Sequence, residues 1–427
     1  MNANPPVPRH SPKIVALVVG FSCLAALAEG FEMQAPGVTL PVLSKVFGLT
    51  SGDGVVSGFL SQRSLFLSIG IFGLILGSVG GGLATDKLGH KWVAVGSVAI
   101  FGIFSILTAY APDARFLLAW RLLTGVGLGG ALPALLTVIG ETVSAERRST
   151  AIGVFHSTMP LGGVLVGLVS IQLATPTEWP MIYVIGGIIP LLAAVGLAAV
   201  LPARSKFPVN TIEAADGPRS SGRFLLFADG RAWITTALWV AYVCLMVQSA
   251  ILLGWMPVLL HGGGLRIEDA FLAQIGFNVS AVLGYIAAGV MMDRWSRRAT
   301  VPLVFTLAAA SLAYLANAPA QLGFVIAGTC MVGMAMSAAG TILYTLALGA
   351  YPPELRGRGV GYAVAVGRFG SALGPLIGGA MLGAGLHPMS VLLALIPLVL
   401  LAGIAAHFVN SRDLAAARQV MADNLRA

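Results

Sequence analysis

Charged side chains inside apolar stretches are the residues of this sequence best placed to do chemistry. Glu29 and Glu32 lie three residues apart in one apolar run, so a helix there places both carboxylates on one face. Arg121 and Arg368 lie in two other apolar runs. Ionisable groups in such surroundings are costly and mark functional sites by default. The glutamates are suited to exchanging protons, and a guanidinium is suited to binding an organic anion through two parallel hydrogen bonds.

Charge balance among these four residues links the two activities. With both glutamates ionised, their charges cancel those of Arg121 and Arg368. A bound anion adds one negative charge, and a proton on either glutamate cancels that charge again. The count favours a site that takes up an anion together with protons. The alternative is that either arginine is purely structural, with Arg121 forming a bridge to a glutamate.

Four further polar or aromatic residues in apolar runs are weaker candidates for contacting the same anion. Among them, His156 is expected to line the site rather than to carry protons, although an imidazole ring titrates near neutral pH. The three cysteines have neither a disulfide nor a metal-binding spacing. The sequence therefore predicts no metal and no cofactor. The proton is the expected coupling ion. The four candidates are Gln34, His156, Asn278 and Tyr344.

Membrane-spanning helices must position all these residues. The 427 residues are 57% hydrophobic and only 10% charged, whereas soluble proteins have about 25% charged residues. The net charge of +8 does not indicate nucleic-acid binding, because the basic residues fall between apolar runs. A spanning helix needs about 20 apolar residues. Twelve such helices are predicted, over residues 14–42, 64–84, 92–111, 115–142, 150–173, 181–201, 232–260, 270–292, 300–316, 320–350, 359–383 and 389–410. Residues 51–63 fit either a loop or an extension of the second helix.

The distribution of basic residues predicts the orientation. Most of the 25 lysines and arginines fall into alternate loops, and only Lys45, Arg63, Arg115 and Arg266 fall into the other set. Basic residues collect on the cytoplasmic side. We therefore expect a multi-pass protein of the cell inner membrane, with both termini in the cytoplasm.

The chain contains an internal repeat. The pattern Gly82-x-x-x-Asp86-Lys87 recurs as Gly289-x-x-x-Asp293-Arg294, and Glu146-x-Arg148 recurs as Glu354-x-Arg356 at nearly the same offset. Six helices return each repeat to the same side, so the two repeats are parallel, and such proteins bind their substrate between the halves. The predicted domains are a six-helix repeat over 1–201, a cytoplasmic linker over 202–231 and a second six-helix repeat over 232–427.

The loop Gly82–Lys91 resembles the signature loop of the major facilitator superfamily, and Gly289–Arg298 resembles a weaker copy of it. The glycine-rich run Arg121–Gly130 also resembles a superfamily pattern. The resemblance implies the major facilitator fold, all-α with twelve transmembrane helices. It also implies a gate at the cytoplasmic surface, formed by Gly82, Asp86, Lys87, Gly89, Lys91, Asp293 and Arg294.

A closer resemblance rests on Glu29–Gly37, together with Gly96–Ala109, Arg121–Pro133 and Gly359–Gly379. These segments are similar to the aromatic acid:proton symporter family, and within it to the transporters of 3-(3-hydroxyphenyl)propionate. The family usually has an aspartate where Glu32 stands. The resemblance implies a proton-coupled symporter that imports a small aromatic or related organic acid by alternating access. Its expected partners are the organic anion, protons and the lipid bilayer, without nucleic acid, and it is expected to function as a monomer.

Two alternatives of other kinds remain. A proton-coupled exporter of drugs or metabolites would usually carry Gly-Pro-x-x-Gly-Gly in the fifth helix. There the sequence has Pro160-Leu-Gly162-Gly163, and the full element lies at Gly374–Gly379. A membrane enzyme or a receptor is less expected, because no nucleophile–base pair, metal-ligand spacing or long soluble segment is present. The sequence therefore predicts that the chain is not an enzyme.

Overall fold

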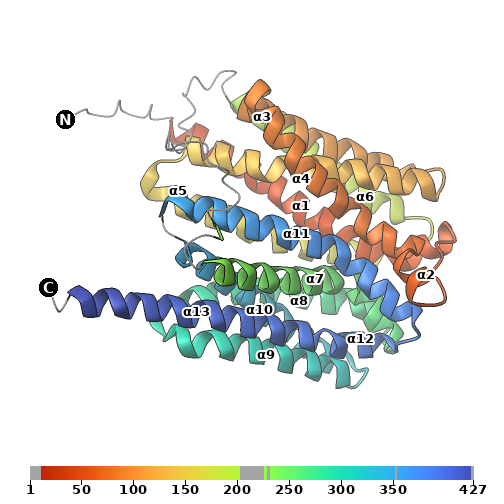
Figure 1. The fold of residues 1–427 in the computed structure, drawn as a ribbon. Coiled ribbons are helices and arrows are strands. Elements are labelled where there is room, and N and C mark those ends of the chain that lie inside the picture. The colour runs from red at the N-terminus through yellow and green to blue at the C-terminus, as the bar shows by residue number, and fades with distance from the viewer. Residues whose placement is uncertain (1–10, 202–225, 228–230, 352, 425–427) are drawn as a thin grey trace. The chain divides into compact units, whose positions relative to one another are not determined.

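Helices make up every regular element of the part of the chain that the structure describes. The computed structural model describes residues 11–201, 226–227, 231–351 and 353–424 (Figure 1). The helices are α1 (Pro12–Val46), α2 (Val55–Phe59), α3 (Gln62–Ala109), α4 (Ala114–Thr142), α5 (Ala145–Leu173), α6 (Trp179–Val200), α7 (Ala232–Gly262), α8 (Ile267–Arg294), α9 (Arg297–Asn317), α10 (Leu322–Gly349), α11 (Pro353–Gly383), α12 (Pro388–Ala394) and α13 (Ile396–Asn424).

Twelve segments of the described chain are long and apolar enough to cross a membrane. Helix α3 contributes two of them, Gln62–Thr85 and Leu88–Ala109, which meet near Gly89. Gly89 has a φ of 76°, a left-handed conformation that favours glycine, so this residue allows the chain to turn between the two spans. Helices α12 and α13 together supply one span, Pro388–Ser411. The predicted all-α fold with twelve transmembrane helices is confirmed, and the chain is a multi-pass membrane protein.

The helices form two compact units. The first contains residues up to Ala35 and Ile69–Lys206, and the second contains Pro36–Ser68 and residues from Phe207 onward. Residues 36–68 therefore make most of their contacts with helices that follow the predicted linker. The division into repeats at 202–231 is based on sequence periodicity and remains a prediction, and most of that linker lies outside the described residues.

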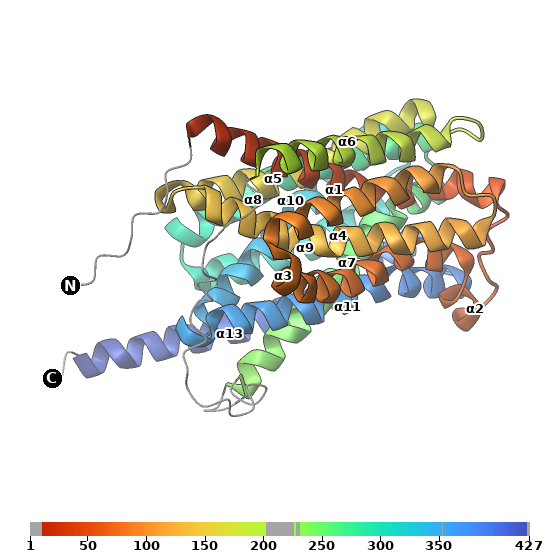
Figure 2. The same cartoon turned by 90° about the horizontal axis from the view of Figure 1, so that it is seen from above.

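Small residues allow the helices of the first unit to pack closely. Helices α1, α4, α5 and α6 run alongside one another in both views (Figure 2). A Cβ atom added at Gly125 of α4 would lie 1.9 Å from the carbonyl oxygen of Gly70 in α3. The glycine-rich run of α4 thus lets the two backbones touch, as is common between membrane helices. This packing brings the backbones of α3 and α4 into direct contact.

The second unit contains α7 to α13 together with α2 and its flanking residues. Helix α7 packs against α11 and α13, and α10 packs against α8 and α9. The ambiguous segment at residues 51–63 contains α2, which lies against the end of α11 (Figure 1). There the Gly54 amide donates to the Gly383 carbonyl oxygen at 2.7 Å, and the Ser64 hydroxyl donates to the Gly58 carbonyl oxygen at 2.8 Å.

Candidate coupling site in the first unit

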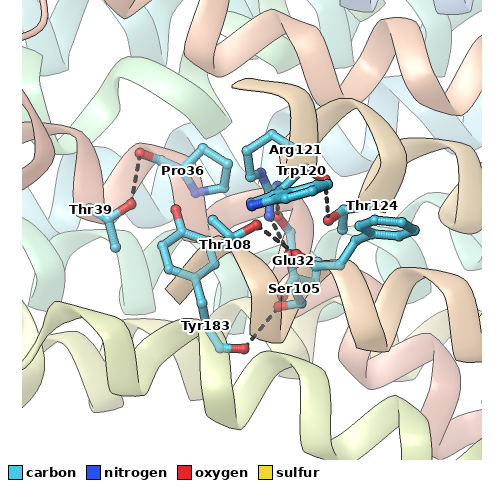
Figure 3. Close-up of polar contacts among 10 residues, drawn as sticks. Glu32, Pro36, Thr39, Ser105, Thr108, Trp120, Arg121, Thr124 and Tyr183 are labelled. Carbon is cyan, nitrogen blue, oxygen red and sulfur yellow. Dashed lines mark hydrogen bonds and ion pairs between the residues drawn. The ribbon is translucent and has the colours of Figure 1, made fainter. Parts of the chain in front are cut away.

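A buried ion pair between α1 and α4 is the centre of the candidate site. Arg121 Nη1 donates to Glu32 Oε2 at 2.5 Å, and the side chains are only 3% and 0% exposed (Figure 3). Both charges are therefore removed from solvent and depend on each other. Removing one partner of such a pair typically costs about 3–5 kcal/mol, because the other charge is left uncompensated. The bridge between Arg121 and a glutamate, which the sequence left open as an alternative to substrate binding, is present.

The backbone of α1 provides Arg121 with a second acceptor. In an α-helix, the carbonyl oxygen of Glu32 would accept the amide hydrogen of residue 36, but that residue is Pro36 and has no amide hydrogen. Arg121 Nη2 donates to this carbonyl oxygen at 3.1 Å. A buried carbonyl without a partner is costly, so the arginine also repairs the defect that the proline leaves in the helix.

Helices α3 and α6 enclose the other carboxylate oxygen. The Ser105 hydroxyl donates to Glu32 Oε1 and also lies 2.9 Å from the carbonyl oxygen of Tyr183. A Cβ atom added at Gly186 would lie 2.4 Å from Oε1, so the glycine provides the space that this oxygen occupies. Glu32 is thus held by side chains or backbone from α3, α4 and α6 (Figure 3).

An aromatic ring lies over the guanidinium, and a second ring packs against the first. The Tyr183 ring is fully buried, and the Arg121 guanidinium carbon lies 5.5 Å from its centroid. Trp179 contacts Tyr183 edge-on at 6.1 Å between centroids. The negative face of an aromatic ring attracts a cation, and the attraction is largest away from water. These rings therefore stabilise the cation while keeping the surroundings of low polarity.

The remaining predicted residues of the first unit have different environments. Glu29 is buried one turn before Glu32 on α1, and Gln34 is buried on the same helix. His156 of α5 is exposed, and its ring contacts Phe155 edge-on with 5.4 Å between centroids. Among the predicted residues of this unit, Arg121 and Glu32 are brought into direct contact with each other.

Three predicted binding residues belong to the second unit. Asn278 of α8 is buried, and its side-chain amide donates to the Gln274 carbonyl oxygen of the same helix at 2.9 Å. Arg368 of α11 is half-buried, and Tyr344 of α10 is 51% exposed. Arg368 is thus the more accessible of the two predicted arginines.

The predicted gate residues lie around the break in α3, in the first unit, and at the end of α8, in the second unit. Lys91 Nζ donates to the carbonyl oxygen of Ala198 at 2.9 Å and to that of Leu201. The last carbonyls of a helix have no partner within it, so this lysine caps α6. Gly82, Gly89 and Arg294 are exposed. The side chains of Asp86, Lys87 and Asp293 lie outside the described part of the structure.

Sequence reasoning missed Ser105 and Tyr183. Neither is charged, and a serine in a helix usually satisfies its hydroxyl on its own backbone, so Ser105 gives no signal among apolar residues. The arginine–glutamate pair, by contrast, gives a clear signal because intramembrane charges are rare. A buried polar residue facing a predicted intramembrane carboxylate becomes apparent only when the helices are placed.

Comparison with known proteins agrees with this architecture. The family model described as the Major Facilitator Superfamily matches residues 22–284 and 264–422. The 3-(3-hydroxy-phenyl)propionate transporter of Escherichia coli (strain K12) is 33% identical over 407 residues, which cover 95% of this chain and 96% of that protein. The gallate transporter of Pseudomonas putida is 30% identical over 399 residues, covering 87% and 86%.

A solved structure shows the same fold. The crystal structure of a D-xylose-proton symporter superposes with a TM-score of 0.76 at 18% identity, over 92% of this chain and 96% of that one. A 4-hydroxybenzoate transporter of Pseudomonas aeruginosa is 28% identical over 418 residues, covering 90% of this chain and 91% of that protein, and it agrees with the predicted resemblance to aromatic acid transporters. Both the family and its named relatives confirm that the chain is a transporter and not an enzyme. The chain belongs to the Major Facilitator Superfamily.

Proposed function

We propose that this transporter imports a small aromatic acid together with protons by alternating access, with Glu32 as the coupling group. The observation that carries the proposal is the fully buried contact between Glu32 and Arg121. The relatives that transport 3-(3-hydroxy-phenyl)propionate and gallate support the substrate class. The solved proton symporter of the same fold is compatible with proton coupling.

Coupling follows from the charge balance of the pair. A proton on Glu32 removes the negative charge that compensates Arg121 and leaves a buried cation. An anion bound nearby supplies the missing negative charge. Proton binding therefore favours anion binding, and anion binding favours proton binding by the same factor. Glu29, buried one turn away on α1, is the second member of the proposed proton-exchanging pair.

The two arginines have different proposed roles. Arg121 is already occupied by the carboxylate and the backbone of Glu32, and its proposed role is to compensate the charge of that carboxylate. Arg368 of α11 is half-buried, and it is the proposed ligand of the substrate carboxylate because a guanidinium binds a carboxylate through two parallel hydrogen bonds. Gln34, His156, Asn278 and Tyr344 remain proposed contacts for the rest of the substrate.

The setting of this activity is also part of the proposal. The transporter lies in the cell inner membrane with both termini in the cytoplasm and functions as a monomer without a cofactor. Gly82, Asp86, Lys87, Gly89, Lys91, Asp293 and Arg294 form its cytoplasmic gate. The positive-inside distribution of lysine and arginine supports this orientation.

Transport into proteoliposomes tests the proposal. With an acidic exterior and an alkaline interior, the wild type should accumulate a labelled aromatic acid above its external concentration. Glu32→Gln should abolish accumulation and retain exchange of labelled for unlabelled acid. Glu178→Gln is a matched control, because Glu178 is exposed and makes no side-chain cap at α6. Accumulation by Glu32→Gln would disprove the role of Glu32, and wild-type uptake that ignores the pH gradient would disprove proton coupling.

A further inference from the structure

We infer that Ser105 is a positioning residue whose hydroxyl follows the proton on Glu32. When Glu32 is ionised, Ser105 donates to it, and when Glu32 is protonated, Ser105 accepts from it and donates to the backbone of α6. The inference rests on the proposed role of Glu32 in proton coupling.

The geometry gives one hydroxyl two acceptors. Ser105 Oγ contacts both Glu32 Oε1 and the Tyr183 carbonyl oxygen, the latter at 2.9 Å, and all three residues are fully buried (Figure 3). A serine hydroxyl has one hydrogen to donate and two lone pairs that accept. It can therefore donate to only one of these oxygens at a time, and the protonation state of Glu32 decides which one.

Each protonation state has a complete arrangement. With Glu32 ionised, the Ser105 hydrogen points to Oε1, and Tyr183 retains the acceptor role that its carbonyl has within α6. With Glu32 protonated on Oε1, the acid hydrogen points to Ser105 Oγ, and the serine hydrogen turns to the Tyr183 carbonyl oxygen. A buried donor without an acceptor would be costly, and neither state contains one along this path.

The surroundings select Oε1 as the protonated oxygen. Oε2 faces Arg121 Nη1 at 2.5 Å, where an acid hydrogen would meet the donors of the guanidinium. Arg121 from α4 and Ser105 from α3 bond to Glu32, the Tyr183 ring of α6 lies beside the guanidinium, and Glu29 is buried one turn away on α1. The histidine of α5 is exposed. Ser105 is therefore the acceptor that these contacts provide for a proton on Oε1.

Substitution of Ser105 should shift the pH profile of uptake in one direction. Ser105→Ala removes a charge-assisted hydrogen bond from the ionised form and a weaker neutral one from the protonated form. The substitution therefore favours protonated Glu32, and the pH profile of uptake should move to higher pH by about 0.5 to 1 unit. A shift of that size corresponds to about a three- to ten-fold change in the proton concentration needed for uptake. Ser105→Thr keeps the hydroxyl and should restore the wild-type profile.

The matched control is Thr108→Val on the same helix. Thr108 is also fully buried, but its hydroxyl donates to the Phe104 carbonyl oxygen at 2.7 Å rather than to Glu32. The pH profile of uptake by the Thr108→Val variant should stay that of the wild type. An unshifted profile in Ser105→Ala, or an equal shift in Thr108→Val, would overturn the inference.

Infrared difference spectroscopy between acidic and neutral pH gives a second readout that does not depend on transport. The band of a protonated carboxyl that disappears in Glu32→Gln is assigned to Glu32. In Ser105→Ala that band should move to higher frequency, because the acid hydrogen loses its acceptor. A band at the wild-type frequency would disprove the hydrogen bond to Ser105. If the wild type lacks proton-driven uptake, the proposed function fails, whereas the band still tests the contact.

Discussion

Replacement of Arg121 by lysine and Pro36 by alanine tests why an arginine stands at this position. Arg121 uses two nitrogens, one on the Glu32 carboxylate at 2.5 Å and one on the Glu32 carbonyl oxygen at 3.1 Å. The single ammonium of lysine keeps the charge but lacks the planar fork that serves both oxygens. Pro36→Ala adds an amide hydrogen that can satisfy the carbonyl within α1.

The expected magnitudes come from the carbonyl contact. In the wild-type background, Arg121→Lys leaves a buried carbonyl without a partner, which costs about 1–3 kcal/mol in the free energy of unfolding. In the Pro36→Ala background, the helix itself satisfies that carbonyl, so the same substitution should cost about 1–2 kcal/mol less. The two substitutions should therefore be strongly non-additive.

Unfolding in mixed micelles, followed by tryptophan fluorescence, measures all four proteins of this cycle. The matched control is Pro160→Ala, which removes a proline from within α5 instead. Its effect should add to that of Arg121→Lys. Additivity between Pro36→Ala and Arg121→Lys within about 0.5 kcal/mol would refute the explanation that the arginine satisfies the carbonyl that the proline leaves free.

Three further substitutions test other contacts. Gly186→Ala places a Cβ atom 2.4 Å from the coupling carboxylate, so uptake should fall and the protein should be destabilised by about 1–3 kcal/mol. Gly96→Ala, with no atom within 4 Å of the new Cβ, should leave uptake and unfolding unchanged. Gly379→Ala should destabilise by a similar amount in an unfolding titration, because its Cβ meets the segment around α2, whereas Gly361→Ala on the same helix meets nothing within 4 Å. Arg368→Lys should weaken binding of the aromatic acid by about ten-fold and leave any binding of its uncharged amide unchanged; equal losses for acid and amide would contradict the assignment.

The transmembrane helices were predictable because spanning a bilayer requires long apolar runs, which are visible in the sequence. A bridge between Arg121 and one of the glutamates could be foreseen as an alternative because few partners exist for a charge within such runs, but the sequence did not show that the partner is Glu32. The contact of Ser105 with Glu32 was not predictable, because it depends on the rotation of α3 about its axis. Residues 51–63 also could not be assigned, since α2 has only five residues and is held by backbone contacts to α11. The roles of the other predicted site residues in transport remain predictions.

The contact between α2 and α11 has a consequence for movement. It is made by backbone groups and glycines, with Gly54 bonded to Gly383, while Val55 and Val56 are 60% and 74% exposed. Large side chains do not interlock there, so few rotamers must be fixed when the two segments meet, and little side-chain entropy is lost. The junction can therefore separate and re-form without any repacking of large side chains. Bulky substitutions at these glycines would therefore change the lifetime of the closed junction more than the chemistry of the coupling site.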